Sequence, residues 1–414
     1  MRKSVAALFA LGLLSGAAHA QQTIKIGYID PLSGGGASIG ELGLKNLQLI
    51  VDHLNAAGGA NGKKFEILPL DNKTNPQESL VQAQKAIDQG ARFITQGNGS
   101  SVAAALTDFA LKNNDRNPDK QILYLNYAAV DPVLTNDKCN YWHFRWDANS
   151  DIKMQALTTF MKDRPNIKKV YLINQDYSFG QSVRTQARAM LKEKRSDVQI
   201  VGDELHPLLK VTDFAPYVAK IKASGADTVI TGNWGQDIAL LLKAAADAGL
   251  NVDWYTYYAG GAGGPTAIKQ SNIPDRVFAI VEGVANNEPA ESQKLEEEFR
   301  AKYTAQSGST MPYPRMINQM RMLAKAINDA KSEDAKAVAA KLEGMTAKTH
   351  GGSDGYMRKD DHQFFQDMYI ASFGPNAAGA KFDDEKTGWG WKIQGTVKAK
   401  DTELPTTCKM DRPS

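Results

Sequence analysis

Residues 23–36 read TIKIGYIDPLSGGG, a strand-like segment that runs into a glycine-rich one. Its first seven residues alternate polar and apolar side chains, as a β-strand does, and the glycines that follow are typical of a loop. At 40–55 the apolar residues recur every three or four positions, which predicts an amphipathic helix. A strand at 65–70, a helix at 77–90 and a strand at 93–95 come next. This β-α-β-α-β order predicts a parallel sheet with helices on both faces, because a parallel connection must cross over the sheet.

A second series of alternating strands and helices begins near residue 169, after the first has ended with a helix at 102–112 and a strand at 121–125. Its elements are strands at 169–173, 198–201 and 228–230 and helices at 180–194, 214–224 and 236–248. We therefore expect two α/β lobes. The rest of the chain holds a strand at 277–283, helices at 291–306, 313–330 and 332–342, a late strand at 366–373 and a polar, irregular tail.

The first 20 residues are typical of a signal peptide. Arg2 and Lys3 precede an apolar run at 5–14, and the segment ends in the small-residue pattern Ala18-His19-Ala20 that a signal peptidase accepts. The apolar run is about half of the roughly 20 residues that a membrane-spanning helix needs. No cysteine follows it to carry a lipid. We expect cleavage after Ala20 and a freely diffusing protein in the periplasm.

Charge and cysteine content narrow the function. The chain has 49 basic and 46 acidic residues, and removal of Arg2 and Lys3 with the signal peptide leaves 47 basic residues and a net charge of +1. This balance gives no electrostatic reason to expect nucleic acid as a partner. Cys139 and Cys408 are the only cysteines. In an oxidising compartment one disulfide between them is the natural pairing, and two unrelated buried thiols are the alternative.

Short segments in a fixed order give the chain a resemblance to a known family. They are 24–27, 32–34, 40, 54–59 and 62–63 near the start, then 96–101, 128–129 with Pro132, 176–180, 227–232 and 244–250. In this order they resemble the leucine/isoleucine/valine-type (type I) periplasmic solute-binding proteins of ABC importers, over nearly all of the mature chain. The resemblance implies two Rossmann-like α/β lobes with parallel sheets, joined by a three-crossing hinge, with the ligand cleft between them.

The family's crossings would fall near residues 145–149, 281–286 and 351–355. Lobe 1 would then comprise residues 21–146 and 284–352, and lobe 2 would comprise residues 147–283 and 353–374. Residues 375–414 would form a tail that packs back on lobe 1, where a Cys139–Cys408 disulfide would hold it on the hinge side. Closure would hand the ligand to ABC permease subunits in the inner membrane. We expect the binding protein itself to be a monomer.

The resemblance places the ligand's carboxylate against lobe 1. Asn98 lies in the loop before a helical run, and Ser100 aligns with the family's carboxylate serine. A helix N-terminus favours an anion because its first N–H groups have no partner within the helix. Ser100 or Ser101 could instead simply cap the helix. The neighbouring loop, with Tyr127, Ala128 and Ala129, would add backbone contacts.

Two positions depart from the family's amino-acid site. This chain has Val130 where the family has a threonine, so one hydroxyl is missing. The family's glutamate faces the ligand's α-ammonium, and Tyr258 stands at the aligned position. A buried cation needs a partner charge. Asp237 could supply one, or it could pair with the dipole of its own helix. We therefore expect no acidic side chain at the position where the family binds the ligand's ammonium group.

The other cleft positions are aromatic, namely Tyr177, Phe179 and Trp234, with Tyr258 beside them. Each one alone could be a core residue, but together at predicted loop ends they indicate an aromatic-lined cleft. Ring contacts add about 0.5–1.5 kcal/mol per pair beyond area burial. We expect an aromatic or other hydrophobic monocarboxylate as the ligand, with a branched-chain or related amino acid as the alternative.

No pattern for catalysis, metal binding or nucleotide binding accompanies these residues. The histidines lack metal-ligating spacing, no Gly-x-Ser-x-Gly occurs, and the glycine-rich segments 34–36 and 260–264 do not match a dinucleotide-binding loop. We expect no enzyme activity, no cofactor and no metal. A receptor that reports the ligand to a membrane sensor stays open as an alternative, because its lobes would close in the same way.

Overall fold

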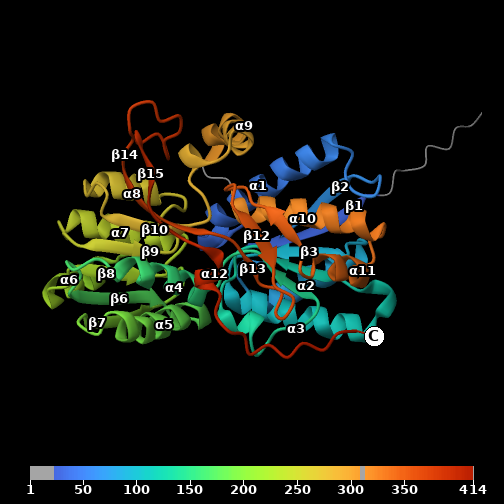
Figure 1. The fold of residues 1–414 in the computed structure, drawn as a ribbon, viewed down its shortest axis with the longest axis horizontal. Coiled ribbons are helices and arrows are strands. Elements are labelled where there is room, and N and C mark those ends of the chain that lie inside the picture. The colour runs from blue at the N-terminus through green and yellow to red at the C-terminus, as the bar shows by residue number, and fades with distance from the viewer. Residues whose placement is uncertain (1–22, 308–312, 414) are drawn as a thin grey trace, which may run out of the picture.

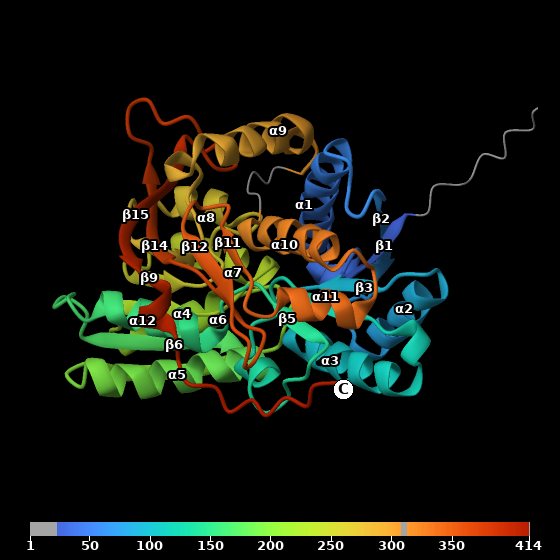
Figure 2. The ribbon, with the colours of Figure 1, turned by 45° about the vertical axis from the view of Figure 1, so that its right-hand side comes forward.

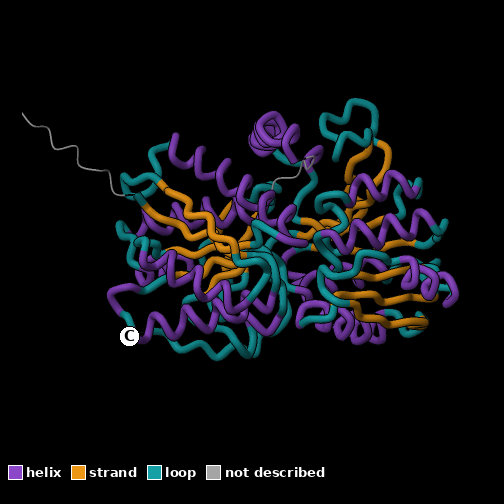
Figure 3. The backbone as a smooth tube through the Cα atoms, turned by 180° about the vertical axis from the view of Figure 1, so that it is seen from behind, coloured by secondary structure: helices purple, strands orange, loops and turns teal. Residues whose placement is uncertain are grey.

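The computed structural model describes residues 23–307 and 313–413, so the predicted signal peptide lies outside the described residues. Figure 1 shows two lobes side by side, and Figure 3 shows from behind that the strands form a separate sheet in each lobe. The prediction of two α/β lobes is confirmed. None of the described helices is long and apolar enough to cross a membrane.

Lobe 1 is built on a five-stranded sheet in the order β2-β1-β3-β4-β5, in which every neighbouring pair is parallel. Helices from two distant parts of the chain share its core, because α10 and α11 return to it from beyond residue 313. The strands are β1 (Ile24–Asp30), β2 (Phe65–Asp71), β3 (Phe93–Gln96), β4 (Leu123–Asn126) and β5 (His143–Arg145). The helices are α1 (Ala37–Ala56), α2 (Pro76–Asp88), α3 (Ser100–Arg116), α9 (Ala290–Ser307), α10 (Pro314–Ala330) and α11 (Ala335–Leu342).

Lobe 2 is built on a seven-stranded sheet in the order β15-β14-β10-β9-β8-β6-β7. Helices α4 and α5 pack into the core on one side of this sheet, and α6, α7 and α8 pack into the core on the other. The strands are β6 (Lys169–Gln175), β7 (Gln199–His206), β8 (Thr228–Thr231), β9 (Asp253–Thr256), β10 (Val277–Val281), β14 (Met368–Pro375) and β15 (Trp389–Val397). The helices are α4 (Ser150–Met161), α5 (Ser178–Lys194), α6 (Ala215–Ser224), α7 (Gln236–Asp247) and α8 (Gly264–Ser271), with α12 (Ala399–Thr402) after β15.

Local sequence fixes where α4 starts and how closely α1 approaches β1. Asn149 accepts a hydrogen bond from the backbone N–H of Ile152 and so caps α4 directly after the first crossing. Gly40 lets α1 approach the end of β1, because a Cβ at this position would lie 1.8 Å from the Pro31 carbonyl oxygen. Short 3-10 turns occur at Gly34–Gly36, Pro118–Lys120, Pro132–Thr135 and Ala285–Asn287.

The core packing shows where the chain passes from one lobe to the other. Trp146 packs in the core of lobe 1 and Ala148 in that of lobe 2, and Val284 packs in lobe 2 before the chain returns with α9. For the third crossing, expected near 351–355, residues 356–365 lie at the boundary between the lobes, because Met357 and Phe364 pack in the core of lobe 1 whereas Tyr356 and Phe365 pack against that of lobe 2. A small antiparallel sheet includes residues of this boundary and is made of β11 (Thr346–Lys348), β12 (Asp354–Met357) and β13 (Phe364–Phe365).

The predicted irregular tail over residues 375–414 is wrong for its middle part. β15 pairs with β14 in antiparallel register at the edge of the lobe 2 sheet. Trp389 and Trp391 are buried there, and Phe373 of β14 contacts both of their rings. The tail therefore belongs first to lobe 2 and only afterwards reaches lobe 1.

Residues 398–413 then cross from lobe 2 to lobe 1, and we call this segment the strap. It runs along the outside of both lobes to the C-terminus in Figure 2. The Thr406 hydroxyl donates to the Thr135 carbonyl oxygen at 3.0 Å, and Arg412 pairs with Glu343 at 2.9 Å. The predicted Cys139–Cys408 disulfide is present. The strap is thus a fourth, covalently fixed link between the lobes.

Candidate functional site

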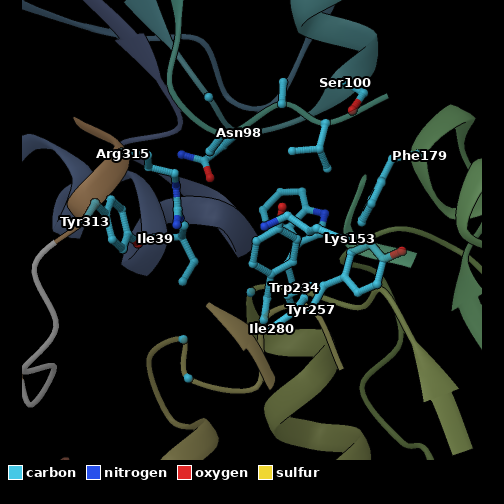
Figure 4. A pocket seen from close by; sticks show the side chains of 18 of the residues that line it. Ile39, Asn98, Ser100, Lys153, Phe179, Trp234, Tyr257, Ile280, Tyr313 and Arg315 are labelled. Atoms are coloured by element: carbon cyan, nitrogen blue, oxygen red, sulfur yellow. The ribbon is translucent and has the colours of Figure 1, made fainter. Parts of the chain in front are cut away.

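A cavity of about 80 Å³ lies between the two lobes at the hinge. One water molecule needs about 10–15 Å³ on the same scale, so the cavity has room for a small organic molecule. Figure 4 shows side chains from both lobes around it. Lobe 1 contributes Ile39, Gly97, Asn98, Gly99, Ser100, Ala128, Ala129, Val130, Tyr313 and Arg315, and lobe 2 and the crossings contribute Lys153, Tyr177, Phe179, Trp234, Gly235, Tyr257, Tyr258, Gly260, Gly261, Ala279, Ile280, Val281 and Glu282.

On the lobe 1 side, Asp30 holds the loop that carries Asn98. Its carboxylate accepts hydrogen bonds from the backbone N–H of Gly97 at 3.2 Å and of Asn98 at 2.9 Å, and from the Tyr127 hydroxyl at 2.7 Å. Burial raises the pKa of Asp30 to about 7, although these three donors act to lower it. Asp30 is the last residue of β1, and its importance was missed in the sequence.

Helix α3 begins at Ser100 and points its N-terminus at the cavity. Gly99 precedes it with a φ of 94°, a conformation that favours glycine, and makes no side-chain cap. The N–H groups of the first helical turn have no partner within the helix, so this end of α3 can receive an anion. Ser100 is buried, and its hydroxyl oxygen accepts from the Asp131 N–H at 3.3 Å.

The neighbouring loop offers less than expected. Asn126 Oδ1 already accepts the backbone N–H of Ala128 at 3.2 Å and that of Ala129 at 2.8 Å. Both alanines line the cavity, but these two donors are engaged by Asn126. Val130 packs with the core of lobe 2, and its carbonyl oxygen accepts from the Ser150 N–H at 2.9 Å. The loop therefore contacts both lobes.

The lobe 2 side of the cavity is a set of aromatic rings. Phe179 lies 5.9 Å from both Tyr177 and Tyr257 and 6.1 Å from Tyr258, measured between ring centroids. The Trp234 indole N–H donates to the Tyr177 hydroxyl at 2.7 Å. Tyr257 donates to the Ser150 carbonyl oxygen and Tyr258 to Asp147. Because the indole N–H of Trp234 and the hydroxyls of Tyr257 and Tyr258 already donate hydrogen bonds within the protein, the rings offer mainly apolar surface to the cavity.

Four charged side chains meet where the crossings border the cavity. Lys153 Nζ lies 2.7 Å from Asp147 Oδ1 and 3.6 Å from Glu282 Oε1. Arg315 lies 3.4 Å from Glu282 Oε2 and 3.6 Å from Asp147 Oδ2. Burial raises the pKa of Asp147, against the pull of Lys153 and Arg315. Burial would also raise that of Glu282, but the same two cations lower its pKa below the usual range.

Eight of the ten predicted ligand-binding residues line the cavity, namely Asn98, Ser100, Ala128, Ala129, Tyr177, Phe179, Trp234 and Tyr258. Tyr127 lies beneath the Asn98 loop instead, and Ser101 is exposed. Asp237 is buried outside the cavity, where it accepts from Gln175 and from the Leu209 N–H.

Sequence reasoning missed Lys153, Glu282 and Arg315. They come from α4, from the end of β10 and from the start of α10, three segments far apart in the chain. Their place in the sequence could have indicated them, because each lies within a few residues of an expected crossing or of the start of a predicted helix. Within residues 23–307 and 313–413, no group of three or more His, Cys, Asp or Glu residues could hold a metal ion.

Two α/β lobes that enclose one small cavity at a shared hinge define the class of a two-lobed binding protein. A family model described as periplasmic binding protein matches residues 23–380. The chain belongs to this family.

Individual relatives agree over almost the whole chain. A Brucella abortus protein named Leu/Ile/Val-binding protein homolog 4 is 33% identical, covering 98% of this chain and 96% of its own. The closed crystal structure of the leucine-, isoleucine-, valine-, threonine- and alanine-binding protein of Brucella ovis is 31% identical with a TM-score of 0.83, covering 95% of this chain and 100% of its own. A Rhodopseudomonas palustris solute-binding protein crystallised with benzoate shares the fold at 18% identity and a TM-score of 0.76, with 94% and 100% covered.

Proposed function

We propose that this protein captures a small aromatic or hydrophobic monocarboxylate between its lobes in the periplasm and presents it to the permease of an ABC importer. The observation that carries the proposal is the composition of the cavity. The N-terminus of helix α3 borders one side of the cavity, and aromatic rings line the other side.

The carboxylate has a suitable position at the start of α3. Free N–H groups and the positive end of the helix dipole favour an anion there, and the buried Ser100 hydroxyl adds a donor. The apolar part of the ligand would then extend toward Trp234 and Tyr258, whose rings can stack on it. A flat acid fits this arrangement because it needs donors at one end only.

An amino acid would need an acceptor for its ammonium group as well. Tyr258 stands at the family's glutamate position, and its hydroxyl is directed to Asp147 at 3.2 Å. Glu282 is the one acidic residue among those lining the cavity, and it lies against two cations, Lys153 and Arg315. A ligand ammonium would compete with both for the same carboxylate.

Relatives support both ligand classes. The names of the two Brucella proteins favour branched-chain and small amino acids as the second candidate. The benzoate complex of the R. palustris protein supports aromatic acids at the level of the fold. A sensing role for the same closure stays an alternative to import, and neighbouring permease and ATPase genes would favour import.

A thermal-shift screen of a small carboxylate library, including leucine and valine, tests the proposal. A ligand that binds only the folded protein raises its melting temperature. We expect benzoate- or cinnamate-type acids, or branched aliphatic acids, to give the largest shifts. A shift from leucine and valine with none from the amino-free acids would favour the second candidate.

A further inference from the structure

Arg315 is the cationic side chain that lobe 1 sends into the cavity. It is the second residue of α10, and it lines the cavity from the lobe 1 side, as Asn98 does, opposite the aromatic rings (Figure 4). Its ring neighbour is Tyr313, whose centroid lies 4.6 Å from the guanidinium carbon. The side chain is 12% exposed, so its charge is largely removed from water.

The bonds that Arg315 makes are long. Its distance to Glu282 is 3.4 Å, its Nε lies 3.6 Å from Asp147, and this Nε makes no hydrogen bond within the described residues. The short ion pair of the cluster is Lys153–Asp147 at 2.7 Å, which leaves Glu282 as the main partner of Arg315. Because Glu282 is engaged and the guanidinium keeps its positive charge beside the cavity, Arg315 favours a ligand anion over a ligand cation there.

We propose that Arg315 is the specificity-determining residue of this cavity, selecting anionic ligands over zwitterionic ones by pairing with Glu282 and by placing a positive charge beside the cavity. The inference rests on the proposed function, because it concerns the same cavity. In physical terms, a ligand ammonium near Glu282 would be repelled by the guanidinium, whereas a carboxylate or carbonyl oxygen would be attracted.

Removal of Arg315 should therefore change the selectivity as well as the affinity. Without the guanidinium, Lys153 Nζ still lies 3.6 Å from Glu282, but the carboxylate oxygen that Arg315 had paired with is open to the cavity. An amino acid could then place its ammonium against this carboxylate. The acid that lacks an amino group gains nothing from the change and loses the attraction of the guanidinium charge.

The test uses 4-methylpentanoate and leucine, which differ only by the amino group, titrated by calorimetry into the wild-type protein and into R315M, R315K and R315M/E282Q. We expect R315M to shift the affinity ratio toward leucine by about 10- to 100-fold, the range for a hydrogen bond to a charged group. R315K keeps the charge and should stay within a few-fold of wild type. R315M/E282Q should lose the gain, because the acceptor is gone.

The outcomes distinguish the role of Arg315 from the proposed ligand class. An unchanged ratio in R315M, or the same gain in R315M/E282Q, would overturn the inference. A wild-type protein that prefers leucine, with a ratio that still shifts in R315M, would overturn the proposed ligand class and leave the role of Arg315 standing. If the wild type binds neither compound, the inference is overturned, and the proposed function is decided by the titrations with benzoate and cinnamate. Melting temperatures of all variants check folding, and R315Q replaces R315M if the latter does not fold.

Discussion

The Tyr127 hydroxyl donates a hydrogen bond of 2.7 Å to Asp30, and so joins the ends of β4 and β1 beneath the loop that carries Asn98. Both side chains are fully buried. The same carboxylate holds the backbone of Gly97 and Asn98, so the position of the α3 N-terminus depends on one buried acid.

Stability should fall with rising pH through Asp30. Its pKa is about 7 in the folded protein against an ordinary value of 3.8 for an aspartate side chain, so between these values the folded state binds more protons than the unfolded state and loses stability as the pH rises. D30N removes this dependence. The difference in unfolding free energy, wild type minus D30N, should decrease from pH 4 to pH 7 by at most about 4 kcal/mol. Urea unfolding at several pH values measures it, and parallel profiles would contradict the account.

Ser100 and Ser101 should behave differently although they are neighbours. Ser100 is buried at the cavity and Ser101 is exposed outside it. S100A should weaken the binding of a carboxylate ligand by about 10-fold or more, as expected for the loss of a hydrogen bond to a charged group. S101A is the matched control and should leave affinity unchanged. Equal effects in calorimetry would mean that the α3 N-terminus is not the anion site.

Trp234 should report binding by fluorescence. It is one of six tryptophans and lines the cavity, whereas Trp389 packs at the far edge of the lobe 2 sheet. Ligand addition should change the emission of the wild type and of W389F. W234F should bind with a much smaller emission change. A full change in W234F would place the responding tryptophan elsewhere.

The strap should restrain opening. Replacement of both cysteines in C139S/C408S removes the covalent link between residues 269 positions apart. Loss of a native disulfide costs roughly 2–5 kcal/mol in small secreted domains. We expect a lower melting temperature, and in small-angle scattering a larger radius of gyration of the ligand-free variant. Identical values for variant and wild type would show that the three crossings alone set the opening.

The parts of the site that the sequence predicted are those that lie at strand ends. Ser100 follows β3 and Tyr177 follows β6, and parallel sheets bring such ends to one edge. Glu282 also directly follows a strand, β10, although the predicted strand ran on to residue 283 and so included it. Lys153 and Arg315 could not be found this way, because they lie in the first turns of α4 and α10 and not at strand ends.

Two further features could not be placed from the local sequence pattern, namely strand β15 and the lobe boundary near the third crossing. The strand β15 was missed because its overall composition is polar, although Trp389 and Trp391 alternate toward the core. Near the third crossing, Met357 and Phe364 pack in lobe 1 and Tyr356 and Phe365 pack against lobe 2, an alternation that depends on tertiary contacts and not on local pattern.

The most direct test of the ligand class is calorimetric titration of the wild-type protein with benzoate, cinnamate, leucine and valine under one set of conditions. We predict saturable heat with an aromatic acid and at least tenfold weaker binding of leucine and valine, the difference expected for an ammonium without a free acceptor. Tight binding of leucine with no heat from either aromatic acid would contradict it.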